Sequence, residues 1–263
     1  MKKVKYIALL IISILLWSPI VANASSNIAI DTNRAKEGIV RISYEGLRKK
    51  TKVMVKKDST VYYYDLKNEE DSFPLQLGDG NYTISVLENV SGEKYKLLTE
   101  KRFRADIIDE NAVFLKSTQP VLWDEDKEAI KLANELSKGK KSNQEVVQAI
   151  YEYIVTNIDY DYTKLNKLSS DYTPDIDVVL KDSKGICYDY SVLFAAMLRS
   201  QGIPAKLVKG YRVGINAYHA WNEVYINNRW EIIDTTIDSY MLNDGTSHNM
   251  FQDKNNYNKL KEY

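Results

Sequence analysis

Apolar and polar residues alternate with a period of two along most of residues 27–105. This alternation is typical of strands that bury one face, and turn residues such as Gly78-Asp79-Gly80 separate the runs. The runs expected to form strands are 38–44, 52–56, 59–64, 71–77, 81–88 and 94–99. Short strands at this spacing predict a small, immunoglobulin-like β-sandwich with no candidate catalytic residue.

The pattern changes to a helical period near residues 110–123. A helix is predicted over Asp124–Ser137, with Asp124 as its N-cap and Gly139 just past its end. Ser142 and Glu145 have the spacing of a capping box that opens a second helix. We therefore expect a β domain over 25–110, a linker over 111–123 and a second domain over 124–263.

The second domain is predicted to contain a long polar loop, a third helix and then strands. The loop covers residues 157–183, and the helix begins at Cys187 and is ended by Gly202 and Pro204. The strands are expected at 205–213, 219–226 and 229–234. The tail after residue 243 is polar and is expected to be loosely held.

The first 24 residues have the pattern of a secretory signal peptide. Lys2, Lys3 and Lys5 precede an apolar run over 6–17, and Ala22-Asn23-Ala24 is a cleavage site. The run is short for a transmembrane helix, although an uncleaved anchor is the alternative. We expect a secreted protein, extracellular or cell-wall associated, with no transmembrane span after cleavage; its lysine- and tyrosine-rich composition suggests a bacterial source.

The composition is that of a folded protein and gives no support to polyanion binding. The chain has 263 residues, of which 44% are hydrophobic and 27% charged, enough to build a core. Removing the three lysines of the signal peptide leaves 33 basic and 36 acidic residues, a net charge of about −3. This balance does not favour nucleic acids or anionic membranes as partners.

Cys187 is the only cysteine, so the chain cannot form an internal disulfide. Its thiol must be buried, paired with another molecule or functional. It follows Gly185-Ile186 and begins an apolar helical run. The positive potential at a helix N-terminus stabilises a thiolate, the reactive form of cysteine. The alternative is that Cys187 is a small buried apolar residue.

A predicted hairpin provides two partners for this thiol. Asn227-Asn228 fits a two-residue turn, because asparagine tolerates the positive φ that such turns require. Counting back along both strands places Trp221 opposite Asp234, and His219 falls on the same face, diagonal to Asp234. A three-residue turn would place Asp234 on the other face. The turn therefore predicts that His219 contacts Asp234.

These three side chains suit nucleophilic catalysis by a thiol. A carboxylate fixes the tautomer of an imidazole and stabilises its protonated form. The imidazole in turn takes the proton of a nearby thiol. Taken singly, His219 could be a core histidine and Asp234 the cap of a strand end, but their joint placement with Cys187 favours catalysis.

The chain resembles the transglutaminase-like superfamily over about residues 125–240. The motifs that carry the resemblance are Gly185-Ile186-Cys187, 198–205, Gly210-Tyr211, 219–224 and 230–236. The resemblance implies an α+β, papain-like core in which helices pack on an antiparallel sheet. It also implies Cys187 as nucleophile, His219 as base and then acid, and Asp234 as the residue that orients His219.

The oxyanion hole is expected to use the Cys187 N–H and an upstream donor, for which Tyr160 is preferred over Tyr162 and Tyr172. Tyr188 and Trp221 are further candidates for the cleft, or for packing. No metal or cofactor is expected, because 159–161 and 175–177 lack the rest of a calcium-binding loop.

Three functions are compatible with these residues. The first is acyl transfer from protein amide groups to amines through a thioester on Cys187. The second is hydrolysis of peptide or amide bonds by the same core, on cell-wall or extracellular substrates. The third is a non-enzymatic adhesion or scaffold protein with a vestigial triad. A shared fold does not decide between them.

Overall fold

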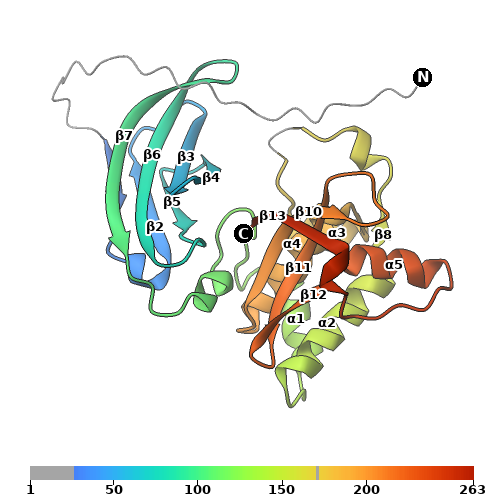
Figure 1. The fold of residues 1–263 in the computed structure, drawn as a ribbon. Helices are drawn as coiled ribbons and strands as arrows, with labels where there is room; N and C mark the ends of the chain where they lie inside the picture. The colour runs from blue at the N-terminus through green and yellow to red at the C-terminus, as the bar shows by residue number, and fades with distance from the viewer. Residues whose placement is uncertain (1–26, 170–171) are drawn as a thin grey trace. The chain divides into compact units, whose positions relative to one another are not determined.

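The computed structural model describes residues 27–169 and 172–263 (Figure 1). The predicted signal peptide, residues 1–24, lies outside the described residues. Two compact units make up the chain, the first ending at Ile108 and the second spanning Asp109–Tyr263. None of the helices in the described ranges is long and apolar enough to cross a membrane.

The first unit contains two antiparallel sheets (Figure 1). One has the order β1-β2-β5, formed by β1 (Ile28–Asp31), β2 (Ile39–Tyr44) and β5 (Glu70–Pro74). The other has the order β4-β3-β6-β7, formed by β3 (Thr51–Lys57), β4 (Thr60–Leu66), β6 (Gly80–Ser91) and β7 (Lys94–Ala105).

The two sheets of the first unit share a core. Val40 and Ile42 on β2 and Val53 and Val55 on β3 are fully buried, as the period-two pattern requires. Tyr64 on β4 and Phe73 on β5 lie with ring centroids 5.7 Å apart, so side chains of the two sheets meet. The unit is therefore a small all-β sandwich.

The second unit is α+β, with helices packed against an antiparallel sheet. The helices are α1 (Glu128–Ser137), α2 (Asn143–Asn157), α3 (Ile176–Asp182), α4 (Cys187–Ser200) and α5 (Thr235–Asn243). The sheet has the order β12-β11-β10-β13, formed by β10 (Ala205–Arg212), β11 (His219–Ile226), β12 (Arg229–Ile233) and β13 (Tyr257–Glu262). The short strands β8 (Asp159–Tyr160) and β9 (Lys184–Gly185) pair in parallel.

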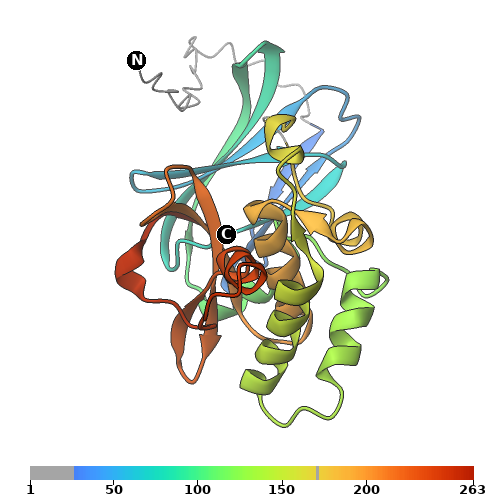
Figure 2. The same cartoon turned by 90° about the vertical axis from the view of Figure 1, so that its right-hand side faces the viewer.

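Helix α4 is the centre of the second unit, between the sheet and helices α1 and α2 (Figures 1 and 2). Residues 189–199 of the helix are all buried. Arg199, near its end, donates to the backbone oxygens of Ala205, Lys116 and Tyr263. A helix that is buried on every side must be surrounded by other elements. Its first residue, Cys187, is only partly buried, so the thiol lies at the edge of this core.

The start of α1 differs from the sequence prediction, whereas the predicted cap of α2 is confirmed. Helix α1 begins at Glu128, because the Asp124 carboxylate accepts the N–H of Asp126 in a preceding turn and does not cap a helix. Ser142 does cap α2, accepting the N–H of Glu145. The Glu145 carboxylate returns to the N–H of Lys141, one residue before the expected partner.

The predicted linker and the polar tail are both packed into the second unit. In the stretch 111–123, expected as a linker, Phe114 packs edge-on against Trp230 with ring centroids 5.5 Å apart. The tail after residue 243, expected to be loosely held, ends in β13, which pairs with β10. The tail prediction is wrong because it relied on local polarity, whereas β13 is held by backbone pairing with β10 although none of its residues is fully buried.

Candidate active site

Cys187 is the first residue of α4, as predicted. The turn before it is closed by Asp189, whose buried carboxylate accepts the N–H of Ile186 at 2.8 Å. Lys164 forms an ion pair with the same carboxylate at 2.8 Å. A Cβ at Gly185 would lie 2.6 Å from the Cβ of Asp189, so this turn requires glycine. The sequence therefore fixes the position of the thiol through a glycine and a buried acid.

The hairpin that carries the other two residues forms as predicted. Asn227 and Asn228 have φ values of 53° and 61°, the positive angles of a tight two-residue turn. Tyr225 is paired with Trp230 in the resulting register. His219 begins β11, and Asp234 follows β12 as the N-cap of α5.

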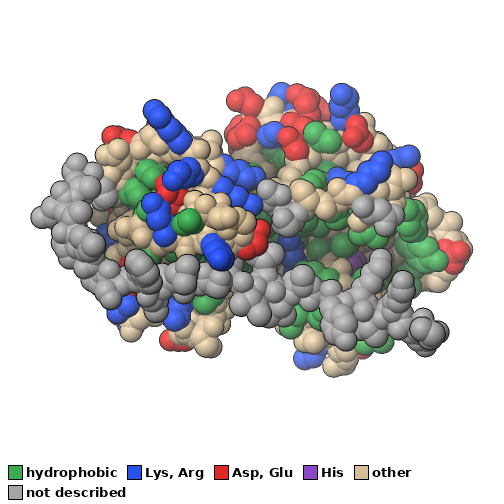
Figure 3. Space-filling model, turned by 90° about the horizontal axis from the view of Figure 1, so that it is seen from above, with side chains coloured by type: hydrophobic (Ala, Val, Ile, Leu, Met, Phe, Trp, Pro, Cys, Tyr) green, Lys and Arg blue, Asp and Glu red, His purple; other side chains and the backbone are tan. Residues whose placement is uncertain are grey.

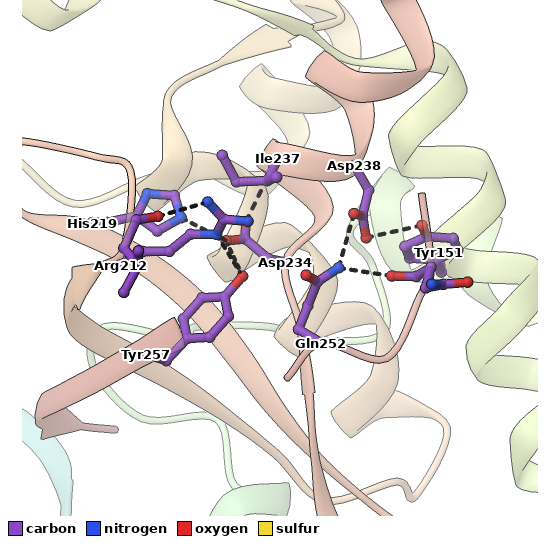
Figure 4. Close-up of polar contacts among 10 residues, drawn as sticks. Tyr151, Arg212, His219, Asp234, Ile237, Asp238, Gln252 and Tyr257 are labelled. Atoms are coloured by element: carbon purple, nitrogen blue, oxygen red, sulfur yellow. Dashed lines mark hydrogen bonds and ion pairs between the residues drawn. The ribbon is translucent and has the colours of Figure 1, made fainter. Parts of the chain in front are cut away.

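The predicted contact between histidine and aspartate is present (Figure 4). His219 Nε2 lies 2.7 Å from Asp234 Oδ2, and both side chains are buried. Because Asp234 engages Nε2, the nitrogen left to serve the thiol of Cys187 is Nδ1.

The environment of His219 favours the imidazolium form. Burial by itself lowers the pKa of His219, but the hydrogen bond and charge of Asp234, together with Cys187, raise it to about 10. A protonated imidazole beside the thiol stabilises a thiolate, as in other thiol–imidazole pairs.

Cys187 and His219 open onto one cleft of about 770 Å³. Its walls come from β8 and the loop that follows it, from the loop before His219, and from α5. The larger apolar and aromatic side chains of these walls are Tyr160, Tyr162, Leu165, Ile215, Tyr218, Ile237 and Tyr240. Hydrophobic side chains are gathered on this unit in the space-filling view (Figure 3). Such a cleft suits a peptide segment with apolar side chains.

Tyr160 lies in this cleft, as the sequence suggested. It is paired with Gly185, two residues before Cys187, where β8 and β9 run side by side. Burial, and then the charge of Cys187, raise the pKa of Tyr160 to about 12, so its hydroxyl stays a hydrogen-bond donor. Tyr162, also in the cleft, packs against it with ring centroids 4.8 Å apart.

The structure does not place the other two cleft candidates in the lining. The Tyr188 ring instead faces the ammonium of Lys209, 3.4 Å from its centroid. Trp221 is 1% exposed and packs against the ring of His219 with centroids 6.2 Å apart. Trp221 is therefore a core residue, and Tyr188 is half-buried against Lys209 and the ring of Tyr172.

Sequence reasoning missed a set of polar residues behind Asp234 (Figure 4). The Tyr257 hydroxyl donates to Asp234 Oδ2 at 2.9 Å, and Arg212 Nε donates to the Tyr257 oxygen at 3.0 Å. One signal was available: Gly210 interrupts a strand, which often marks a close approach of another backbone. A Cβ at Gly210 would lie 2.1 Å from the backbone oxygen of Asn258.

A second buried acid, Asp238, lies one helical turn beyond Asp234 (Figure 4). It accepts hydrogen bonds from the Tyr151 hydroxyl and the Gln252 amide, each at 2.9 Å. Burial first, opposed by those hydrogen bonds and reinforced by the charge of Asp234, raises the pKa of Asp238 to about 7.

Within 27–169 and 172–263, no three His, Cys, Asp or Glu side chains are grouped so that they could hold a metal ion.

Comparison with known proteins points to one superfamily. Residues 130–235 match the model of the transglutaminase-like superfamily. Mouse (Mus musculus) kyphoscoliosis peptidase is 30% identical over 126 residues, which are 44% of this chain and 19% of that protein. The UPF0252 protein of Methanocaldococcus jannaschii is 30% identical over 125 residues, 43% of this chain and 35% of that protein. The chain thus spans about a fifth of the mouse relative and a third of the archaeal one.

Among solved structures, a candidate cysteine protease from Cytophaga hutchinsonii is similar with a TM-score of 0.41 and 18% identity. The similarity covers 72% of this chain and 65% of that one.

Proposed function

Because residues 130–235 belong to the transglutaminase-like superfamily, we propose that the chain is a thiol enzyme acting on protein amide groups through a thioester on Cys187. The observation that carries the proposal is the 2.7 Å contact between His219 Nε2 and Asp234 Oδ2, beside a thiol at the start of a helix. This contact leaves Nδ1 as the proton acceptor and donor for the reaction.

In the first half-reaction the Cys187 thiolate attacks the carbonyl carbon of an amide. The C–N bond breaks, the His219 imidazolium gives its proton to the departing nitrogen, and ammonia or an amine leaves. The backbone N–H of Cys187 and the hydroxyl of Tyr160 are the proposed donors to the oxyanion. A thioester remains on the enzyme.

In the second half-reaction we propose that a primary amine resolves the thioester. The neutral imidazole takes a proton from the amine, a new C–N bond forms and the thiolate leaves. The tyrosine-rich walls can pack against the aliphatic part of an amine such as a lysine side chain, which favours such an amine as the acyl acceptor. Asp159 and Asp244 also line the cleft, and their carboxylates would attract its ammonium group.

Hydrolysis is the second candidate, with water in the place of the amine. It is favoured by the name of the mouse relative, kyphoscoliosis peptidase, to which the chain is 30% identical over 126 residues. The acyl-enzyme step, and the residues that perform it, are the same.

The deciding experiment incubates the protein with a fluorescent primary amine as acyl acceptor and a glutamine-rich protein as acyl donor. Covalent incorporation supports transfer, whereas release of ammonia or new peptide ends without incorporation supports hydrolysis. Cys187→Ala and His219→Ala must abolish either activity, and His248→Ala, which changes the only other histidine, must retain it. If a thiol-directed inhibitor fails to label Cys187, both are refuted and a non-enzymatic scaffold remains.

We also propose that the protein is secreted and acts outside the cell or at the cell wall. The basic start, the short apolar run and the Ala22-Asn23-Ala24 site support this. N-terminal sequencing of the protein from culture medium should find Ser25 first. A product that stays in the cell with Met1 intact would refute it.

A further inference from the structure

The carboxylate of Asp234 is held by more than the histidine. Its Oδ2 atom forms a hydrogen bond with His219 Nε2 at 2.7 Å and accepts another from the Tyr257 hydroxyl at 2.9 Å. We propose that Tyr257, itself held by Arg212, is a positioning residue for the catalytic aspartate, so that strand β13 is part of the active site. This inference rests on the proposed roles of Cys187, His219 and Asp234.

Tyr257 reaches Asp234 because β13 pairs with β10. Arg212 and Tyr257 are direct partners in that register, with a shift in the ladder between Lys209 and Gly210. The missing side chain of Gly210 lets the backbone of Asn258 approach. Tyr257 lies beyond the residues that match the superfamily model, which end at 235, so it is a feature of this chain and not of the match.

The direction of the hydrogen bonds follows from their chemistry. A guanidinium only donates, so the Tyr257 oxygen accepts from Arg212 Nε at 3.0 Å. The phenolic hydrogen is then directed to Asp234. Burial, and next the charge of Asp234, raise the pKa of Tyr257 well above its usual value, which keeps that hydrogen in place. Arg212 Nε is also 4.0 Å from Asp234 Oδ2 and adds positive charge.

These contacts decide which way the carboxylate faces. Asp234 is fully buried, and a buried carboxylate needs several donors to stay ionised. Its Oδ1 accepts the N–H of Ile237 at 3.2 Å. Without the Tyr257 hydroxyl, that contact and His219 alone would fix the carboxylate. A carboxylate that is held less firmly stabilises the His219 imidazolium less. Because the imidazolium stabilises the Cys187 thiolate, the thiolate is then stabilised less as well.

Phenylalanine is the right replacement because the tyrosine ring also packs. The ring of Tyr257 lies 5.0 Å from Trp221, which in turn stacks on His219. Tyr257→Phe keeps this packing and removes only the hydroxyl. Tyr225→Phe is the matched control, because Tyr225 lies on the same sheet, packs against Trp230 and is outside the cleft lining.

The test measures the rate of Cys187 alkylation by iodoacetamide against pH in the full mature protein. In Tyr257→Phe the acid limb should move about one pH unit higher, the order expected for one lost charge-assisted hydrogen bond. Turnover of the amide substrate should fall about tenfold. Tyr225→Phe should keep the wild-type profile. An unchanged profile in Tyr257→Phe, or a shift to lower pH, overturns the proposal.

A double variant separates positioning from general stability. If Tyr257 acts through Asp234, Tyr257→Phe should produce no additional shift in an Asp234→Asn background. An equal shift in both backgrounds overturns the proposal. Alkylation requires neither amine nor water, so a profile shift in a protein without turnover supports the positioning role and refutes the proposed reaction. Absence of any pH-dependent alkylation of wild-type Cys187 refutes both.

Discussion

His219 Nε2 lies 2.7 Å from Asp234 Oδ2, although the two residues are 15 positions apart and on different elements. A two-residue turn between β11 and β12 sets that distance, because it fixes which residues of the two strands share a face. The relationship links a local feature of the sequence to the chemistry of the cleft.

Replacing Asp234 with asparagine should lower activity while the fold is retained. Asparagine can still accept the Ile237 N–H through its oxygen, so the start of α5 is kept. The imidazolium loses its carboxylate, and the rate should fall roughly 10²- to 10⁴-fold by analogy with other triads. Steady-state kinetics would show it. Asp126→Asn, at an exposed acid outside the cleft, is the control, and equal losses in both variants would contradict the assignment.

The pKa of about 7 at Asp238 predicts a pH-dependent stability. The usual value is 3.8, so between about pH 4 and 7 the folded protein keeps a proton that the unfolded chain has lost. The contribution of Asp238 to the free energy of unfolding is therefore full below about pH 4 and declines as the pH rises to 7.

Urea unfolding of Asp238→Asn and the wild type between pH 4 and 8 checks this. Asparagine does not titrate, and it can still pair with Tyr151 and Gln252. The variant should gain stability relative to wild type as the pH rises through that window. A difference that is constant with pH would show that Asp238 keeps its usual pKa.

The turn residues should control both stability and reactivity. Alanine at 227 and 228 lacks the short polar side chain that lets asparagine tolerate positive φ. Replacing Asn227 and Asn228 by alanine should therefore cost about 1 kcal/mol per position. We expect lower urea stability and slower alkylation of Cys187, because Asp234 depends on this register. Glycine at both positions accepts the same angles and should keep the alkylation rate. If alkylation is also slower in the glycine variant, the backbone angles of the turn do not control the reactivity of Cys187.

Gly210→Ala should disrupt the strand that carries Tyr257. The new Cβ would lie 2.1 Å from the Asn258 oxygen and 2.9 Å from the Trp221 ring, so β13 must move away from β10. Overpacking of this kind costs about 1–3 kcal/mol, and the melting temperature should fall accordingly. Asn258→Ala is a useful comparison, because its side chain is exposed and only its backbone oxygen makes the close approach to Gly210. If both variants melt alike, the close approach at Gly210 does not matter for stability.

The sequence by itself determined the features that depend on neighbouring residues. Asn227-Asn228 set the hairpin register, and with it the contact between His219 and Asp234. The change of hydrophobic period separated the β unit from the α+β unit, and the apolar run after Gly185 predicted a buried helix that begins at Cys187. These are local patterns, because the type of a turn and the period of hydrophobic positions depend on consecutive residues.

Only the tertiary structure decided what surrounds those residues. The pairing of Arg212 with Tyr257 joins positions 45 apart, and nothing in the polar tail identifies β13 as the partner of β10. Tyr188 and Trp221 lie outside the cleft lining for the same reason: their surroundings, Lys209 for Tyr188 and Tyr257 for Trp221, come from distant segments. Long-range pairing depends on which backbones can approach each other. Here Gly210 permits the approach of Asn258, which lies far along the chain.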